Sequence, residues 1–195
     1  MSQNAKSADD FELTKGFTVR DYRRLEAAKN TQEIANFIRR RFSGRYIEPL
    51  LNVPKEMKSG FCMMAICCLM IEALESFRQG WPDSKGKSKT AFCNFFEHFE
   101  AFRELRGYGD KFYDHVRCGI LHQAETTGGW RIRREKGVPL FASMDPTIGA
   151  NAFLEALQSS FEAYCKELLE AKWDDTVWRN ARTKLAAICD NCQRV

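Results

Sequence analysis

Length, composition and charge limit what this chain can be. Its 195 residues are 44% hydrophobic and 29% charged, which suits one globular domain with a buried core. The formal net charge of +4 is too small to establish a nucleic-acid partner, although clustered basic residues would still suit one. The N-terminal residues lack the apolar stretch of a signal peptide, and the longest apolar run, residues 61–71, is shorter than the ~18–20 residues of a membrane span. We therefore expect a cytoplasmic protein with no membrane partner.

The pattern of apolar residues predicts an all-α fold, a helical bundle of about five to six helices with a small inserted β-hairpin. Residues 1–18 are polar and without period, so we expect them to be disordered and residues 19–195 to form a single domain. The hairpin is predicted around residues 129–142, where apolar residues alternate on both sides of the sequence RREKG and its glycine suits the turn. Such a ribbon needs a surface to pack on, which the bundle would provide.

The first half of the bundle contains its most hydrophobic element. Helical spacing runs from residue 19 to residue 42, and Asn30 is expected to divide this stretch by capping a second helix. Pro49 and Pro54 then predict a connector. Residues 56–79 follow, and because their middle part is apolar on every side, they are predicted to form the central helix of the bundle.

Glu72 and Glu75 are interpreted as the point where the central helix emerges into solvent. The sequence GWPDSKGKSK stops this helix and is expected to form an exposed basic loop. The remaining helices are predicted over residues 90–106, 111–124, 151–172 and 175–190.

The eight cysteines predict reduced thiols and not a disulfide framework, because most of them lie within apolar helical patterns. Cys189 and Cys192 form a lone CxxC near the C-terminus. A zinc site needs further ligands at suitable spacing, and the sequence has no second CxxC and no HxxxH, so we expect no metal and no cofactor. The sequence also lacks a P-loop and a G-x-S-x-G elbow.

The helix predicted over residues 111–124 contains the sequence RCGILH, in which Arg117 and His122 are five residues apart. On an ideal helix this spacing separates the two side chains by about 140°. They can act on one target only if the helix ends or distorts near Gly119, or if two chains related by a dimer axis each contribute a residue.

RCGILH matches R-x4-H, the signature of HEPN domains, a family of α-helical bundles. The chain is also similar to that family in its order of elements, because a very hydrophobic helix precedes the motif and a further long helix follows it. Many HEPN proteins are metal-independent endoribonucleases of toxin–antitoxin and antiviral-defence systems, in which two protomers form a composite site. Others are inactive and bind RNA or nucleotides, or act as partner modules.

The resemblance implies a homodimeric, metal-independent ribonuclease with Arg117 and His122 as its catalytic pair. RNA would be the substrate, and an antitoxin or another protein a further candidate partner. His122 would act as general base or acid on the ribose 2′-hydroxyl or the leaving oxygen, and Arg117 would stabilise charge on the scissile phosphate. The polar candidates for substrate contacts or supporting positions around the pair are Asp114, His115, Gln123, Glu125 and Thr126.

The predicted hairpin adds basic and aromatic residues close in sequence to His122. Its RNA-binding candidates are Trp130, Arg131, Arg133, Arg134 and Lys136. The same residues also suit a charged edge that discourages strand pairing with other chains.

Two alternatives to the ribonuclease stay open. An inactive HEPN-like helical module would bind RNA, a nucleotide or a protein partner and would cleave nothing. A purely structural bundle would keep His122 packed, hydrogen-bonded and away from solvent.

Overall fold

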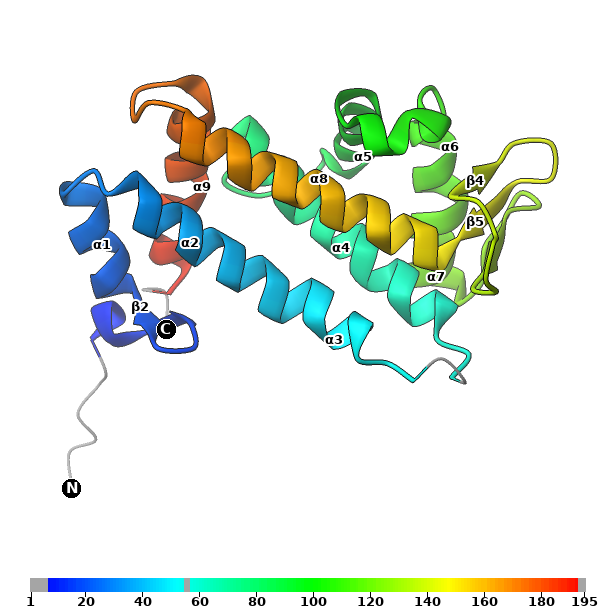
Figure 1. Ribbon diagram of the computed structural model, residues 1–195, viewed down its shortest axis with the longest axis horizontal. Helices are drawn as coiled ribbons and strands as arrows, with labels where there is room; N and C mark the ends of the chain where they lie inside the picture. Colours follow the sequence, from blue (N-terminus) through cyan, green and yellow to red (C-terminus); the bar gives the residue numbers. More distant parts are fainter. Residues whose placement is uncertain (1–6, 55–56, 193–195) are drawn as a thin grey trace.

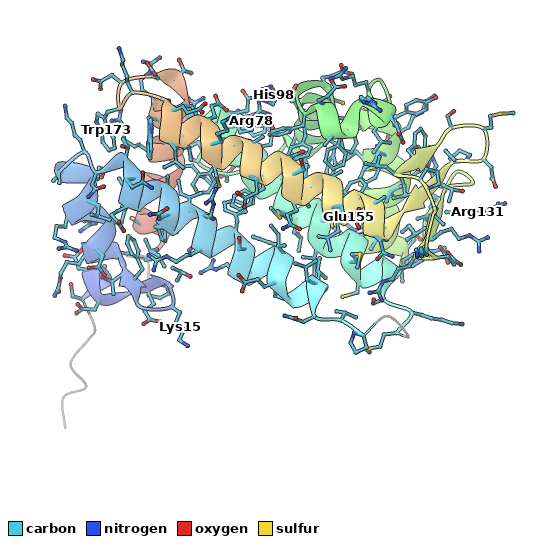
Figure 2. The ribbon with its side chains drawn as sticks, in the orientation of Figure 1. Lys15, Arg78, His98, Arg131, Glu155 and Trp173 are labelled. Carbon is cyan, nitrogen blue, oxygen red and sulfur yellow. The ribbon has the colours of Figure 1, made fainter. Side chains whose placement is uncertain are left out.

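The computed structural model describes residues 7–54 and 57–192. It confirms the all-α fold, a helical bundle with small β elements (Figure 1). The long helices are α2 (Thr31–Phe42), α4 (Gly60–Gln79), α5 (Ser88–His98), α8 (Ala150–Glu170) and α9 (Thr176–Asn191). The molecule is elongated, with the region of Lys15 at one end and the region of Arg131 at the other (Figure 2).

Most of the N-terminal segment that was expected to be disordered is ordered. A 3-10 turn at Ala8–Asp10 is followed by β1 (Glu12–Thr14) and β2 (Phe17–Thr18), which pair in antiparallel fashion. Leu13 and Phe17 are buried in the core, and this burial explains why a polar segment folds. The expectation of disorder is therefore wrong for residues 8–18, while residues 1–6 lie outside the described part of the chain.

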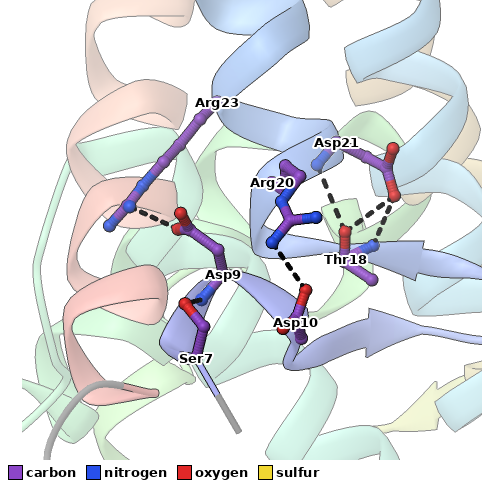
Figure 3. A network of polar contacts seen from close by, with 7 residues as sticks. All are labelled: Ser7, Asp9, Asp10, Thr18, Arg20, Asp21 and Arg23. Carbon is purple, nitrogen blue, oxygen red and sulfur yellow. Dashed lines mark hydrogen bonds and ion pairs between the residues drawn. The ribbon is translucent and has the colours of Figure 1, made fainter.

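Helix α1 (Val19–Ala27) begins with a capping box. The Thr18 hydroxyl accepts from the backbone N–H of Asp21, and the Asp21 carboxylate accepts in return from the Thr18 backbone N–H over 2.9 Å (Figure 3). The backbone N–H and the hydroxyl of Thr18 both donate to the Asp21 carboxylate, and these two hydrogen bonds lower the pKa of Asp21. Two ion pairs beside the cap, Arg20 with Asp10 and Arg23 with Asp9, attach the 3-10 turn to the same helix (Figure 3).

The predicted division at Asn30 is confirmed, because its side-chain oxygen accepts from the backbone N–H of Glu33 at the start of α2. The prediction of a non-helical connector after residue 42 is wrong for residues 43–51, which are helical. A π-helical turn at Ser43–Ile47 continues into the short helix α3 (Glu48–Leu51). Pro49 is the second residue of α3 and has no N–H to donate, and it directly follows the π-turn in which the helical hydrogen-bond pattern has changed.

Helix α4 is the core element of the bundle, and α5, α8 and α9 all pack on it. Its buried side chains include Met64, Cys67, Cys68, Ile71 and Leu74. One face stays open, however, because Phe61, Cys62 and Leu69 are exposed. The prediction of a central helix is therefore correct for most of the circumference of α4 but not for this apolar stripe.

By length and composition, α4 alone among the described helices would be long and apolar enough to cross a membrane. Its mean hydropathy is 1.7, and 61% of the stretch is buried inside the fold. A buried core helix has the same properties, so this feature does not by itself indicate a membrane protein.

The helix predicted over residues 90–106 consists of two pieces. Helix α5 ends at His98, Phe99 is extended with φ −90° and ψ 122°, and a 3-10 segment follows at Glu100–Leu105. The break lets aromatic rings from both pieces enter one cluster, in which Phe96 lies 5.2 Å from Phe102 between ring centroids. The buried rings of this cluster are Phe92, Phe95, Phe96, Phe102, Phe112 and Phe153.

The inserted β element is a three-stranded sheet and not the predicted hairpin. Its strands are β3 (Arg131–Arg133), β4 (Phe141–Ala142) and β5 (Thr147–Gly149), in the order β3-β5-β4. The antiparallel partner of β4 is β5, whereas β3 pairs with β5 in parallel, so no hairpin turn forms at RREKG. Ile132 of β3 packs against the first turn of α4.

Candidate functional site

A wide turn interrupts the motif helix just before the motif. Helix α6 (Gly109–Phe112) leads into a π-helical turn at Tyr113–Arg117, and regular helix resumes as α7 (Cys118–Gln123). Such π-turns are frequent at functional positions of helices. A distortion near Gly119 is one of the two alternatives that the sequence leaves open, and the distortion found lies instead at Tyr113–Arg117. Arg117 ends the π-turn and regular helix runs from Cys118 to His122, so the spacing still places Arg117 and His122 on different sides of the helix.

Gly119 serves the chain reversal that follows α7. The chain turns back at Ala124, whose φ of 54° is left-handed, and the carbonyl oxygen of Glu125 approaches the helix closely. A β-carbon at Gly119 would lie 2.5 Å from that oxygen. Glycine is therefore required here by close packing, and the loop after His122 is held against the helix that carries it.

Arg117 is held by a buried carboxylate of the central helix. Its Nε donates to Oε1 of Glu72 over 2.8 Å, and the Arg117 and Glu72 side chains are only 16% and 10% exposed. Burial by itself lowers the pKa of Arg117, but the hydrogen bond and charge of Glu72 outweigh burial, so the pKa is raised. Arg117 is therefore a permanent cation in a fixed position.

The other oxygen of Glu72 accepts from the loop that follows α4 and from the first residue of α5. The hydroxyl of Ser88 donates to Oε2 over 2.7 Å, and the hydroxyl of Ser84 donates to the same atom over 3.4 Å. One carboxylate thus connects three segments of the chain: α4, the basic loop and the π-turn that carries Arg117.

The outer part of the Arg117 guanidinium is available to a ligand. Within residues 7–54 and 57–192 its two terminal nitrogens donate to no oxygen atom, and they are not among the buried unpaired atoms there. The side chain of Cys118 also hydrogen-bonds to the guanidinium and helps to raise its pKa. The guanidinium carbon lies 5.5 Å from the centroid of the Tyr113 ring. Glu72 and Tyr113 therefore orient Arg117 while leaving the geometry with which arginine binds a phosphate.

His122 lies on the exposed side of α7, next to Leu121, which is 43% exposed. Over the described part of the chain it has no hydrogen bond or ion pair, and none joins it to Arg117. The packed and hydrogen-bonded His122 of a purely structural bundle is thus not found. A single chain presents an oriented guanidinium and an accessible imidazole without bringing them together.

Glu72 and Glu75 do not mark the emergence of the helix into solvent, because both are buried. Arg78 and Gln79 donate to the two carboxylate oxygens of Glu75 over 2.7 and 2.8 Å. Burial nevertheless raises the pKa of Glu75 above its ordinary 4.5. The helical spacing of the sequence does not single out Glu72. The feature of the sequence that could have identified Glu72 is the presence of a glutamate in the most apolar helix, because a buried carboxylate needs a partner.

Two of the polar residues predicted around the pair make local contacts. Asp114 forms an exposed ion pair of 2.7 Å with Lys89. His115 lies with its Nδ1 3.0 Å from the hydroxyl of Thr127, and its carbonyl accepts from the Thr127 backbone N–H. His115 therefore attaches the returning loop to the π-turn, which is a positioning role at most.

The remaining three belong to the loop itself or to the end of α7. The Thr126 hydroxyl donates to the carbonyl of Trp130, and the Glu125 carboxylate accepts from the Thr126 backbone N–H. Gln123 is exposed at the end of α7. These contacts shape the loop beside His122 but do not connect it to Arg117.

Trp130 and Arg134 are not placed to contact RNA. The Trp130 ring is buried, stacked on Phe141 at 5.2 Å between centroids. The Arg134 guanidinium donates to the carbonyl of Met57 over 2.8 Å and to the hydroxyl of Ser59 over 2.6 Å. Arg134 thus holds the segment before α4 against the sheet. An alternating pattern of charges cannot reveal this contact, since the partners are more than 70 residues away in sequence.

Arg131, Arg133 and Lys136 are exposed, as the predicted surface requires. The Nη1 of Arg131 forms an ion pair with Oδ2 of Asp145 over 2.5 Å. The Nη1 of Arg133 lies 3.6 Å from Oε1 of Glu135, which is also an ion pair. Arg131 and Arg133 line a groove of about 600 Å³ beside the first turn of α4. The groove also contains Glu125 and Glu135, so its charge is mixed.

Among the described residues, no group of three or more His, Cys, Asp or Glu side chains is arranged to hold a metal ion. Cys189 is buried and Cys192 is half-buried at the end of α9, and both are free thiols. Burial raises the pKa of Cys189 to about 11, which favours the unreactive thiol form.

No family model, curated protein or solved structure matches this chain.

Proposed function

We propose that this protein is a homodimeric endoribonuclease that cleaves RNA without a metal ion, with Arg117 and His122 as its catalytic residues. The observation that supports this best is the fixation of Arg117 by buried Glu72, which leaves the two terminal nitrogens of the arginine free to bind a phosphate. A largely buried ion pair whose arginine keeps two terminal nitrogens without an acceptor is more readily explained by an anionic ligand than by stability alone.

The proposed reaction is an internal transesterification. The ribose 2′-oxygen attacks the adjacent phosphorus, the bond from phosphorus to the 5′-oxygen breaks, and the products carry a 2′,3′-cyclic phosphate and a 5′-hydroxyl. One His122 accepts the 2′-hydroxyl proton, and the second His122 of the dimer, in its protonated form, donates a proton to the leaving oxygen. Arg117 stabilises the additional negative charge on the phosphoryl oxygens.

The dimer is proposed because one chain leaves both an incomplete site and an uncovered apolar surface. The stripe on α4 consists of Phe61, Cys62, Ala65 and Leu69, and spacings of three and four residues place them on one face. Exposed Leu121 of α7 lies on the helix that packs beside α4. The stripe is uncharged, so a second copy can cover it through a two-fold axis, and α7 of both chains would then lie near that axis.

The test is cleavage of a single-stranded RNA in excess EDTA by purified protein. We expect cleavage by the wild type, a cyclic phosphate on the product, and no cleavage of an RNA with 2′-deoxyribose at the scissile nucleotide. His122→Ala should lower kcat by at least about 10²-fold. His98→Ala removes another exposed histidine, outside the site, and should leave kcat unchanged. Equal rates for His122→Ala and the wild type would refute the proposal.

A further inference from the structure

The segment of residues 81–89, which joins α4 to α5 and includes the first two residues of α5, carries three exposed lysines. Residues 81–89 include Lys85, Lys87 and Lys89 and only one acidic residue, Asp83. All three lysines are exposed. Within the described ranges Lys85 and Lys87 form no ion pair, whereas Lys89 pairs with Asp114. Positive charge that no protein group neutralises is available to the phosphates of a nucleic acid.

The loop is joined to the Arg117 site by hydrogen bonds. Ser88 lies between Lys87 and Lys89 in sequence, and its hydroxyl donates to the Glu72 carboxylate over 2.7 Å. Oε1 of that carboxylate accepts from Arg117. Because one glutamate side chain connects Ser88 to Arg117, the backbone that carries Lys87 and Lys89 is anchored beside the Arg117 site.

Aromatic rings continue the same surface. The Lys87 ammonium lies 5.0 Å from the centroid of the Trp81 ring, and the Lys89 ammonium lies 5.6 Å from that of Tyr113. Tyr113 also contacts the guanidinium of Arg117, so Lys89, Tyr113 and Arg117 form one continuous group. Alternating cations and aromatic rings are the means by which proteins hold single strands without reading their sequence.

The surface on β3 that the sequence suggests is less suited to this purpose. Its two exposed arginines are paired with Asp145 and Glu135, its tryptophan is buried and Arg134 is bound to backbone carbonyls. An RNA strand would have to replace two ion pairs there, but none at Lys85 and Lys87.

We infer that the loop of residues 81–89 binds the phosphates that flank the scissile one, and that the substrate strand leaves Arg117 along Lys85 and Lys87 and not along β3. The inference rests on the proposed function for its substrate class. The interaction is electrostatic and independent of base sequence, and it requires a single strand, whose bases can stack on the half-buried rings of Trp81 and Tyr113.

The experiment measures binding separately from cleavage. A fluorescein-labelled, mixed-sequence single-stranded RNA is titrated with the full chain carrying His122→Ala, over a series of KCl concentrations. In this background we compare three double variants. The loop variant carries Lys85→Gln and Lys87→Gln, the second carries Arg131→Gln and Arg133→Gln, and the third carries Lys15→Gln and Lys29→Gln. The last pair removes the same charge, and its Lys15 lies at the end of the molecule opposite Arg131 (Figure 2).

We expect the loop variant alone to bind more weakly and to lower the slope of log K against log[KCl] by about 1.4, since each lysine that neutralises a phosphate of a single strand contributes about 0.7. In the cleavage-competent chain the same two substitutions should raise KM several-fold and leave kcat within about two-fold.

Three results would overturn the inference: no RNA binding by the His122→Ala chain, equal slopes for the loop and Lys15/Lys29 variants, or the larger loss in the Arg131/Arg133 variant. Failure of the proposed function is distinguishable from these. A wild type that binds RNA along the loop but never cleaves it would refute the ribonuclease and support the loop as the RNA-binding surface.

Discussion

The Nε of Arg117 donates to Oε1 of Glu72, a residue 45 positions earlier in the sequence, and this buried contact joins the π-turn of the motif to the central helix. Water is largely excluded from the Arg117 guanidinium and the Glu72 carboxylate. Each charge is therefore stable in the folded protein only because the opposite charge lies beside it. The contact makes Glu72 a positioning residue for Arg117, because its carboxylate accepts from the Nε of the guanidinium and not from the two terminal nitrogens.

Replacing Glu72 by alanine should destabilise the fold strongly. The substitution leaves the Arg117 cation buried without a partner and also removes the acceptor of the Ser88 hydroxyl. We therefore expect the free energy of unfolding to fall by about 3 kcal/mol. Glu72→Gln keeps one side-chain oxygen as an acceptor for Arg117, so its free energy of unfolding should fall by only about 1.5 kcal/mol. Urea denaturation measures both values.

The exposed pair of Arg39 and Glu162 provides the matched control. Its 2.7 Å contact is as short as that of the buried pair, but the side chains are 42% and 46% exposed. Glu162→Ala should therefore change the free energy of unfolding by less than about 0.5 kcal/mol. A similar loss for Glu72→Ala and Glu162→Ala would show that burial of the first pair has no energetic consequence.

The apolar stripe predicts the oligomeric state. In sedimentation equilibrium the wild type should have twice the mass of one chain, and Leu69→Glu or Leu121→Glu should yield monomers, because each would bury a carboxylate against an apolar surface. RNA cleavage should be lost together with the dimer. Leu169→Glu, which changes a similarly exposed leucine of α8, should leave the mass at that of a dimer. A monomeric wild type, or a Leu69→Glu variant that remains dimeric, would contradict this prediction.

Local patterns account for the parts of the fold that the sequence predicts correctly. The cap at Asn30 depends on residues three positions apart, and the burial of α4 depends on a run of apolar residues. Contacts between distant segments account for the errors. Phe17 is ordered because it stacks on Phe37 at 4.2 Å, and β3 pairs with β5 while Arg134 binds the segment before α4.

The residues of the candidate site likewise fall into those that a local pattern reveals and those that only contacts between distant segments reveal. Arg117 and His122 can be found from their spacing alone, because R-x4-H is a local pattern. Glu72 and Ser88 cannot, because only the packed bundle brings α4 and the basic loop to the π-turn. The π-turn itself has no marker in the sequence, and it places the distortion of the helix at Tyr113–Arg117 and not near Gly119.

Stability should depend on pH through Glu75. Its pKa is about 4.5 when unfolded and is raised in the folded protein by burial. Between these two values the folded state binds more protons, so the free energy of unfolding should fall as pH rises through that window and become level above it. Glu75→Gln should remove this part of the slope, whereas Glu155→Gln, at an exposed position, should retain it. Urea denaturation at a series of pH values measures the slopes, and equal slopes for Glu75→Gln and the wild type would refute the assignment.

Gly119→Ala should disturb the loop after His122 without removing any polar group. The new β-carbon would lie 2.5 Å from the carbonyl oxygen of Glu125, a backbone atom that can move only with its loop. We expect a loss of about 1–3 kcal/mol in the free energy of unfolding, as for other overpacked positions. Gly44→Ala is the control, because nothing lies within 4 Å of a β-carbon there and alanine favours the helical turn. An unchanged stability in Gly119→Ala would mean that the loop is not held against α7.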